Sequence, residues 1–83
     1  MTTTSEMSAP AYADLVRDVV DWVQAERSIG KVATYRSIAR VFRLTHAEID
    51  DIIRDSDAYG PKLILRAGVY SLPVGKTIVE IAP

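Results

Sequence analysis

The amino-acid sequence predicts an α+β fold, with three helices followed by a β-hairpin or a small antiparallel sheet. Two observations carry this prediction. Apolar residues recur at helical spacing through three segments before residue 57, and the segments after residue 61 are typical of short strands. The turn-forming run DAYGP at 57–61 separates the two halves. The chain has 83 residues, which suits a single domain with one modest core.

The first helix is expected to follow a tail. Residues 1–10 are rich in Thr and Ser and lack a periodic apolar pattern, so we expect a disordered tail there and a folded domain over 11–83. Apolar residues at helical spacing then predict an amphipathic helix from Tyr12 to about Arg27. Gly30 follows as the expected C-terminal cap.

The stretch 34–54 is expected to hold two short helices joined by a tight turn. Thr34 is the expected cap of the first. Thr45 followed by Glu48 is a capping box, so the second should start at about His46. Helices this short are stable only when their apolar faces pack against each other and against a third element. The expected core is Leu15, Val19, Val23, Ile38, Ala39, Phe42, Leu44, Ile49, Ile52 and Ile53, with Trp22 packing in the core or at its rim.

Three strand-like segments follow the turn, at 63–65, 69–72 and 77–81. Ala67-Gly68 and the run PVGK at 73–76 separate them. A single hairpin and a three-stranded meander both fit this pattern.

The spacing within 34–54 resembles the helix-turn-helix motif of DNA-binding proteins. The resemblance is carried by the small residue Ala39 in the first helix, by Leu44 in the turn, and by the paired Ile residues of the second helix. That family usually has Gly in the turn, where this chain has Arg43. The whole order of elements resembles the winged helix-turn-helix superfamily, which implies that the hairpin forms a wing with PVGK at its tip. The alternative is an ordinary helical hairpin in a small core.

A second resemblance covers ten residues. The run GKVATYRSIA at 30–39 is similar to the segment that opens the DNA-binding domain of alkylguanine-DNA alkyltransferases and alkyltransferase-like proteins. It implies a helix-turn-helix that works from the minor groove. The reactive Cys of that family is missing, because this chain contains no Cys and its comparable stretch is LILRAGVYSL. Alkyl transfer is therefore excluded.

The net charge of −1 hides an uneven arrangement. Residues 27–43 include five basic side chains and no acid, whereas residues 44–59 include five acids and one base. Duplex DNA attracts clustered Lys and Arg through counterion release. The expected DNA-binding residues are Lys31, Tyr35, Arg36, Arg40, Arg43, Thr45, His46, Arg54 and Lys76. Within this set, the expected phosphate anchors are Arg36, Arg40, Arg43 and Lys76, and the residues expected nearest the bases are His46 and Arg54.

The charges of the third helix argue against a model in which that helix enters the groove of the DNA. Its expected outer face carries Glu48, Asp50, Asp51 and Asp55, and these carboxylates would repel phosphates. Either the second helix, the strand before it and the wing meet the DNA, or the acidic helix docks on a basic protein partner. A dimer in which the acidic and basic faces meet is a further possibility.

The sequence gives little support to catalysis or metal binding. His46 is the only His, and without Cys or further His it cannot assemble a typical zinc site. The acidic run lacks the spacing of a calcium loop, and no Gly-rich phosphate loop is present. No signal peptide or membrane-length apolar run is visible. We therefore expect a cytoplasmic, non-enzymatic DNA-binding protein without cofactors, such as a transcriptional regulator or a phage-type accessory factor, with a protein-interaction module as the alternative.

Overall fold

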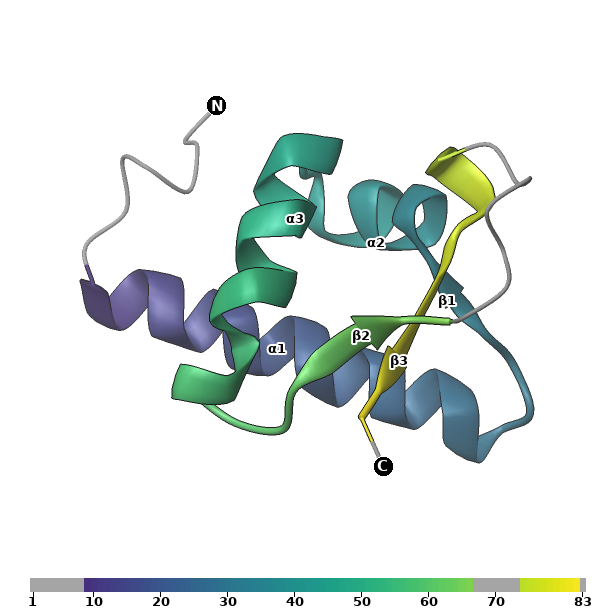
Figure 1. Ribbon diagram of the computed structural model, residues 1–83, viewed down its shortest axis with the longest axis horizontal. Helices are drawn as coiled ribbons and strands as arrows, with labels where there is room; N and C mark the ends of the chain where they lie inside the picture. The colour runs from purple at the N-terminus through teal and green to yellow at the C-terminus, as the bar shows by residue number, and fades with distance from the viewer. Residues whose placement is uncertain (1–8, 67–73, 83) are drawn as a thin grey trace.

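A computed structural model describes residues 9–66 and 74–82. Within them, three α-helices pack with a three-stranded antiparallel sheet (Figure 1). This confirms the predicted α+β class, and the order of elements is compatible with a winged-helix layout. The helices are α1 (Ala9–Ser28), α2 (Tyr35–Phe42) and α3 (His46–Asp55), the strands are β1 (Ala33–Thr34), β2 (Leu63–Leu65) and β3 (Ile78–Ile81), and two 3-10 helices are η2 (Ser56–Ala58) and η3 (Val74–Lys76).

Helix α1 begins earlier than the sequence pattern indicates. It starts at Ala9, inside the segment expected as a tail, and Pro10 lies in its first turn. A proline suits this place because the first turn of a helix has no use for the missing N–H. The rest of the expected tail, residues 1–8, lies outside the described residues.

The end of α1 is closed by Gly30, as the sequence predicts. Gly30 has a φ of 78°, in the left-handed region that favours glycine. Its N–H donates to the Arg27 carbonyl at 3.1 Å, and the Lys31 N–H donates to the Glu26 carbonyl at 2.9 Å. These two bonds form a Schellman motif, which satisfies carbonyls that the helix end would leave free.

Capping boxes begin both α2 and α3. Thr34 Oγ1 accepts the Ser37 N–H at 3.1 Å, and Ser37 Oγ accepts the Thr34 N–H at 2.8 Å. Thr45 Oγ1 accepts the Glu48 N–H at 3.2 Å, and Glu48 Oε1 accepts the Thr45 N–H at 2.9 Å. Thr34 was expected as a cap and Thr45 with Glu48 as a capping box, so the local signals place both helix starts correctly.

The turn between α2 and α3 passes through Arg43 in the left-handed conformation, with φ 56° and ψ 52°. Its N–H and that of Leu44 both donate to the Ala39 carbonyl. Arg43 is the only non-glycine residue with a positive φ among the described residues. The backbone therefore takes the shape that Gly favours, although Arg stands there, at a cost of about 1–2 kcal/mol.

The sheet has the order β1-β3-β2, so the last strand along the chain lies in the middle. Val79 pairs with Ala33 on one side and with Leu65 on the other. The expected strands at 63–65 and 77–81 are confirmed, the latter starting one residue later, at Ile78. The strand expected at 69–72 lies outside the described residues.

A serine side chain joins the end of α3 to β2. Ser56 is fully buried. Its hydroxyl donates to the Ile53 carbonyl at 2.9 Å and accepts the Leu63 N–H at 2.8 Å. Both polar functions of the hydroxyl are thus satisfied inside the core, which a buried hydroxyl requires. The contact fixes where β2 starts relative to α3.

The core lies between α1, the α2–α3 pair and one face of the sheet. Of the expected core residues, five are buried and five pack at its border. Trp22 packs edge-to-face on Phe42, with ring centroids 6.1 Å apart, which confirms its packing role. The buried residues are Ala13, Val16, Val19, Val20, Val23, Ala33, Tyr35, Ile38, Ile49, Ile52, Leu63 and Val79.

Candidate nucleic-acid interface

Three arginines form a row on the outside of α2. Arg36, Arg40 and Arg43 are spaced four and three residues apart, which places them along one side of the helix and its end. All three are exposed. At a rise of 1.5 Å per residue the row spans roughly 10 Å. We call these three residues the α2 stripe.

Helix η3 brings Lys76 to the edge of the α2 stripe. A Cβ atom added to Gly75 would lie 3.5 Å from Arg36 Nε, so the two segments are in van der Waals range. Figure 1 shows η3, in yellow, beside α2. The sequence analysis places 73–76 at the tip of a wing. In the structure, Val74–Lys76 is instead a 3-10 turn just before β3, because it packs against α2.

The α2 stripe has no internal counter-charge. Among the described residues, none of its three guanidinium groups lies within salt-bridge distance of a carboxylate, and neither does Lys76. The basic groups of the α2 stripe do not pair with the acids of α3. The basic face of α2 and the acidic face of α3 therefore form no ion pair with each other.

Most other basic side chains have partners within the fold. Arg17 pairs with Asp14 at 3.2 Å on α1, and Arg66 pairs with Glu80 at 2.7 Å across the sheet. Lys62 Nζ donates to the Ile53 carbonyl at 2.6 Å, at the C-terminal end of α3 where a cation is favoured. These cations bind groups within the fold, whereas those of the α2 stripe form no ion pair among the described residues.

The acidic face of α3 is more occupied than its sequence indicates. Glu48 is only 8% exposed, which corrects the expectation that it faces solvent, since its carboxylate closes the capping box. Asp50 accepts a hydrogen bond from the Tyr35 hydroxyl. Asp51 lies 3.2 Å from Arg54 Nη1.

Asp55 completes this pattern at the end of α3. It pairs with Arg54 at 3.1 Å and accepts the Tyr12 hydroxyl at 2.7 Å. The Arg54 guanidinium, together with the Tyr12 hydroxyl, holds the pKa of Asp55 below its usual value. All four carboxylates of the expected outer face thus have donors within the protein, which weakens the repulsion that they would exert on phosphates.

Tyr35 belongs to the core rather than to the exposed surface. It is 4% exposed, and its hydroxyl donates to Asp50. Burial raises the pKa of Tyr35, and the bond to Asp50 raises it further. The sequence analysis counts Tyr35 as a DNA-binding residue. We remove it from the candidate surface because its hydroxyl is already engaged.

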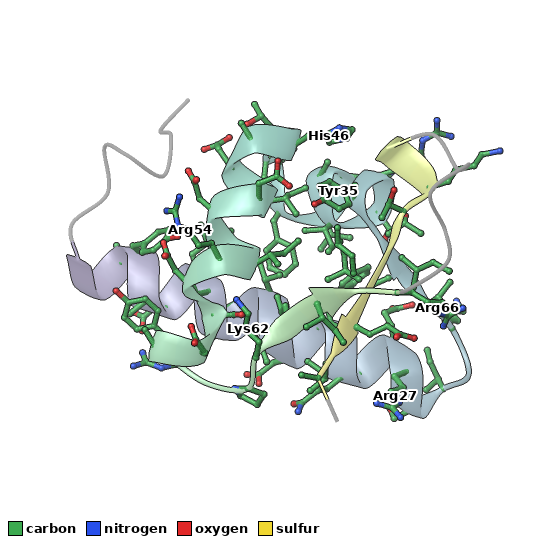
Figure 2. The ribbon with its side chains drawn as sticks, viewed as in Figure 1. Arg27, Tyr35, His46, Arg54, Lys62 and Arg66 are labelled. Atoms are coloured by element: carbon green, nitrogen blue, oxygen red, sulfur yellow. The ribbon has the colours of Figure 1, made fainter. Side chains whose placement is uncertain are left out.

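The remaining expected contacts on α3 divide between its two ends. Thr45 and His46 are exposed at the N-terminal end, where the His46 ring packs edge-to-face on Tyr35. Arg54 lies near the other end, about two turns away, and points towards α1 (Figure 2). The structure therefore separates His46 from Arg54, which the sequence analysis places together nearest the bases.

Lys31 belongs to a different part of the molecule from the α2 stripe. With Arg27 and Arg66 it lines a hollow of about 420 Å³ at the end of α1. The sequence analysis gives no role to Arg66 and does not detect the hollow, because three separate segments form it. The one available signal is that Arg66 lies in the acid-free stretch 60–79.

The described residues hold no cluster of three His, Cys, Asp or Glu side chains that could bind a metal ion. None of their helices is both long enough and apolar enough to cross a membrane.

Comparison with known proteins finds no matching family model, no matching curated protein and no matching solved structure. A functional argument therefore rests on the geometry of the chain itself.

Proposed function

We propose that this protein is a small, non-enzymatic DNA-binding protein that contacts the duplex backbone through the α2 stripe and Lys76. The observation that carries the proposal is the row of three exposed guanidinium groups, none of which forms an ion pair within residues 9–66 and 74–82. Guanidinium groups bind phosphate oxygens in a bidentate manner and release condensed counterions from the duplex. A transcriptional regulator or an accessory factor acting in the cytoplasm fits this activity.

The proposal includes the finer fold assignment. We infer a winged helix-turn-helix in which α2 and α3 form the motif and the strands β2 and β3 belong to the wing. The order of elements and the position of β3 between the other strands support it. In this arrangement the exposed N-terminal end of α3, with Thr45 and His46, faces the groove. The bound carboxylates of α3 make its approach less repulsive than the sequence alone suggests.

The alternative, an acidic α3 that docks on a basic protein or on a second copy, has less support. Such a face would present carboxylates free to pair with the partner. Here Asp51 and Asp55 pair with Arg54, and Glu48 is buried. Docking would have to break these contacts before it could make new ones.

The test is the binding of a fluorescently labelled duplex, measured by anisotropy at several salt concentrations. If four cations each contact a phosphate, the slope of log K against log salt should be about −3 to −4. The double variant Arg36→Ala/Arg40→Ala should reduce the magnitude of this slope by about 2.

The matched control is Arg17→Ala/Arg66→Ala, which removes the same charge from two cations that are already paired. It should leave the slope near the wild-type value. Equal weakening by the two double variants would assign the binding to overall charge instead of the α2 stripe. Absence of binding at low salt would exclude the proposal and direct attention to a protein partner.

A further inference from the structure

A hollow lies at the end of α1 that the proposed DNA contacts do not use. It is bounded by the last turns of α1, the segment 31–33 and strand β3. Its volume of about 420 Å³ falls within the usual range of small-molecule sites. In Figure 1 the segment that leads into β1 lies at the opposite end of that strand from α2. The hollow and the α2 stripe are therefore separate sites.

The walls of the hollow combine apolar and charged side chains. Val23 comes from α1, Val32 from the segment before β1, and Ile78 and Ile81 from β3. Val32 is 50% exposed, so part of this apolar surface faces solvent. Ile29, three residues earlier, is also exposed. Apolar surface in a concave site favours a ligand that covers it, because covering it releases water.

Cations surround this apolar surface. Arg27 and Lys31 line the hollow, and neither has a carboxylate within salt-bridge distance among the described residues. Arg66 also lines it, but it donates to Glu80 through Nε at 2.9 Å and Nη2 at 2.7 Å. Glu80 compensates only that one cation. Figure 2 shows Arg27 and Arg66 towards the same end of the molecule. The hollow thus combines apolar side chains with a net positive charge.

We propose that this hollow binds a small amphipathic organic anion, of the class of medium-chain carboxylates. The alkyl chain packs against Val23, Val32 and Ile78, and the carboxylate pairs with Arg27 and Lys31. A nucleotide fits less well, because the described residues of the lining include no aromatic ring on which a base could stack. The proposal stands independently of DNA binding.

The experiment is a titration of the full, ¹⁵N-labelled chain with octanoate, followed by heteronuclear NMR. Two matched probes separate the two halves of the ligand, since 1-octanol keeps the chain without the charge and acetate keeps the charge without the chain. Octanoate should shift the amides of Val32, Ala33 and Ile81, and it should bind about fivefold more tightly than 1-octanol. Acetate should cause no comparable shifts.

Variants then assign the charge contribution. Arg27→Ala/Lys31→Ala should weaken octanoate binding about tenfold and leave 1-octanol binding unchanged. The control Arg17→Ala/Arg40→Ala removes the same charge outside the hollow and should bind octanoate normally. Both pairs are exposed, and NMR spectra show directly whether each variant is folded. If a variant unfolds, Lys31→Gln replaces it.

Three outcomes would overturn the proposal: shifts that map away from the hollow, equal affinity for octanoate and 1-octanol, or no effect of Arg27→Ala/Lys31→Ala. DNA binding measured on the same variants keeps the two proposals distinguishable. Loss of octanoate binding with normal DNA binding is the expected result for Arg27→Ala/Lys31→Ala. Arg36→Ala/Arg40→Ala should lose DNA binding and bind octanoate normally.

Discussion

Helices α2 and α3 are alike in construction and opposite in the use of their charges. Both are short, begin with a Thr-based capping box and bury one face in the same core. The carboxylates of α3 bind donors within the protein, whereas the guanidinium groups of α2 bind none among the described residues. Like charges one turn apart weaken a helix slightly. Helix stability therefore does not account for the like charges of the α2 stripe, which favours a role in binding an external partner.

The largest loss of stability is expected from Tyr35→Phe, which removes the hydrogen-bond donor to Asp50 on α3. A hydrogen bond to a charged group contributes about 1.5–3 kcal/mol, so the variant should lose roughly that free energy of unfolding. Urea unfolding measures it. Tyr59→Phe is the control, because no hydrogen bond of its hydroxyl is found among the described residues. Equal losses in the two variants would show that the bond to Asp50 contributes nothing.

The same bond predicts an alkaline pH dependence. The pKa of Tyr35 is raised in the folded state, by burial first and then by Asp50. Its contribution to stability should thus be complete below the ordinary tyrosine pKa of about 10 and be lost as pH rises towards the folded pKa. The stability gap between wild type and Tyr35→Phe should narrow above that pH in urea unfolding. A gap that widens there would contradict the assignment.

Arg43→Gly is expected to have the next largest effect. Glycine relieves the left-handed backbone at this turn, so the free energy of unfolding should rise by about 1 kcal/mol. DNA binding should weaken at the same time, because one phosphate contact is lost. Arg43→Ala is the matched variant, since it removes the charge and keeps the strain. It should weaken DNA binding equally without any gain in stability, as urea unfolding beside anisotropy can show.

A smaller difference in the free energy of unfolding is expected between variants that lose a paired arginine and variants that lose an unpaired one. Arg36→Ala/Arg40→Ala should change the free energy of unfolding by less than about 0.5 kcal/mol. Arg54→Ala should lose slightly more stability than this, because it breaks surface contacts with Asp51 and Asp55. Thermal unfolding compares the two. A larger loss from the α2 pair would mean that these guanidinium groups have partners in solution.

An acid dependence of stability is expected from Asp55. Its pKa is lowered in the folded state, so its contribution is present above the ordinary Asp pKa and is lost as pH falls through the folded pKa. Tyr12→Phe removes one of its donors. The variant should differ from wild type at neutral pH and converge with it in acid. Urea unfolding at both pH values gives the comparison, and a constant difference would exclude Asp55 as the cause.

The parts of the fold that depend on neighbouring residues are predictable from the sequence. Gly30, Thr34 and the Thr45–Glu48 pair set the helix ends through contacts within a few residues. The parts that depend on distant contacts are not. Tyr35 is buried because Asp50, fifteen residues later, accepts its hydroxyl. No local pattern contains that information.

The candidate site divides in the same way. The α2 stripe follows from helical spacing alone, so sequence reasoning finds it. The position of Lys76 does not, because η3 packs against Arg36 instead of extending away as a turn. Glu48 is expected both in a capping box and on the outer face of the third helix. These two expectations exclude each other, because a carboxylate that closes a capping box cannot also face solvent freely. The hollow near Arg66 needs three segments to come together, which periodicity cannot reveal.

The strand order has a consequence for how the chain folds. Among the described strands, β1 and β2 each pair with β3, which comes last of the three along the chain. During synthesis on the ribosome, neither early strand can find its sheet partner until residues 78–81 have emerged. The contacts between α2 and α3 join neighbouring segments and can form early, whereas the Ala33–Val79 pairing must close a long loop. Sheet formation is therefore expected to be the slow step of folding.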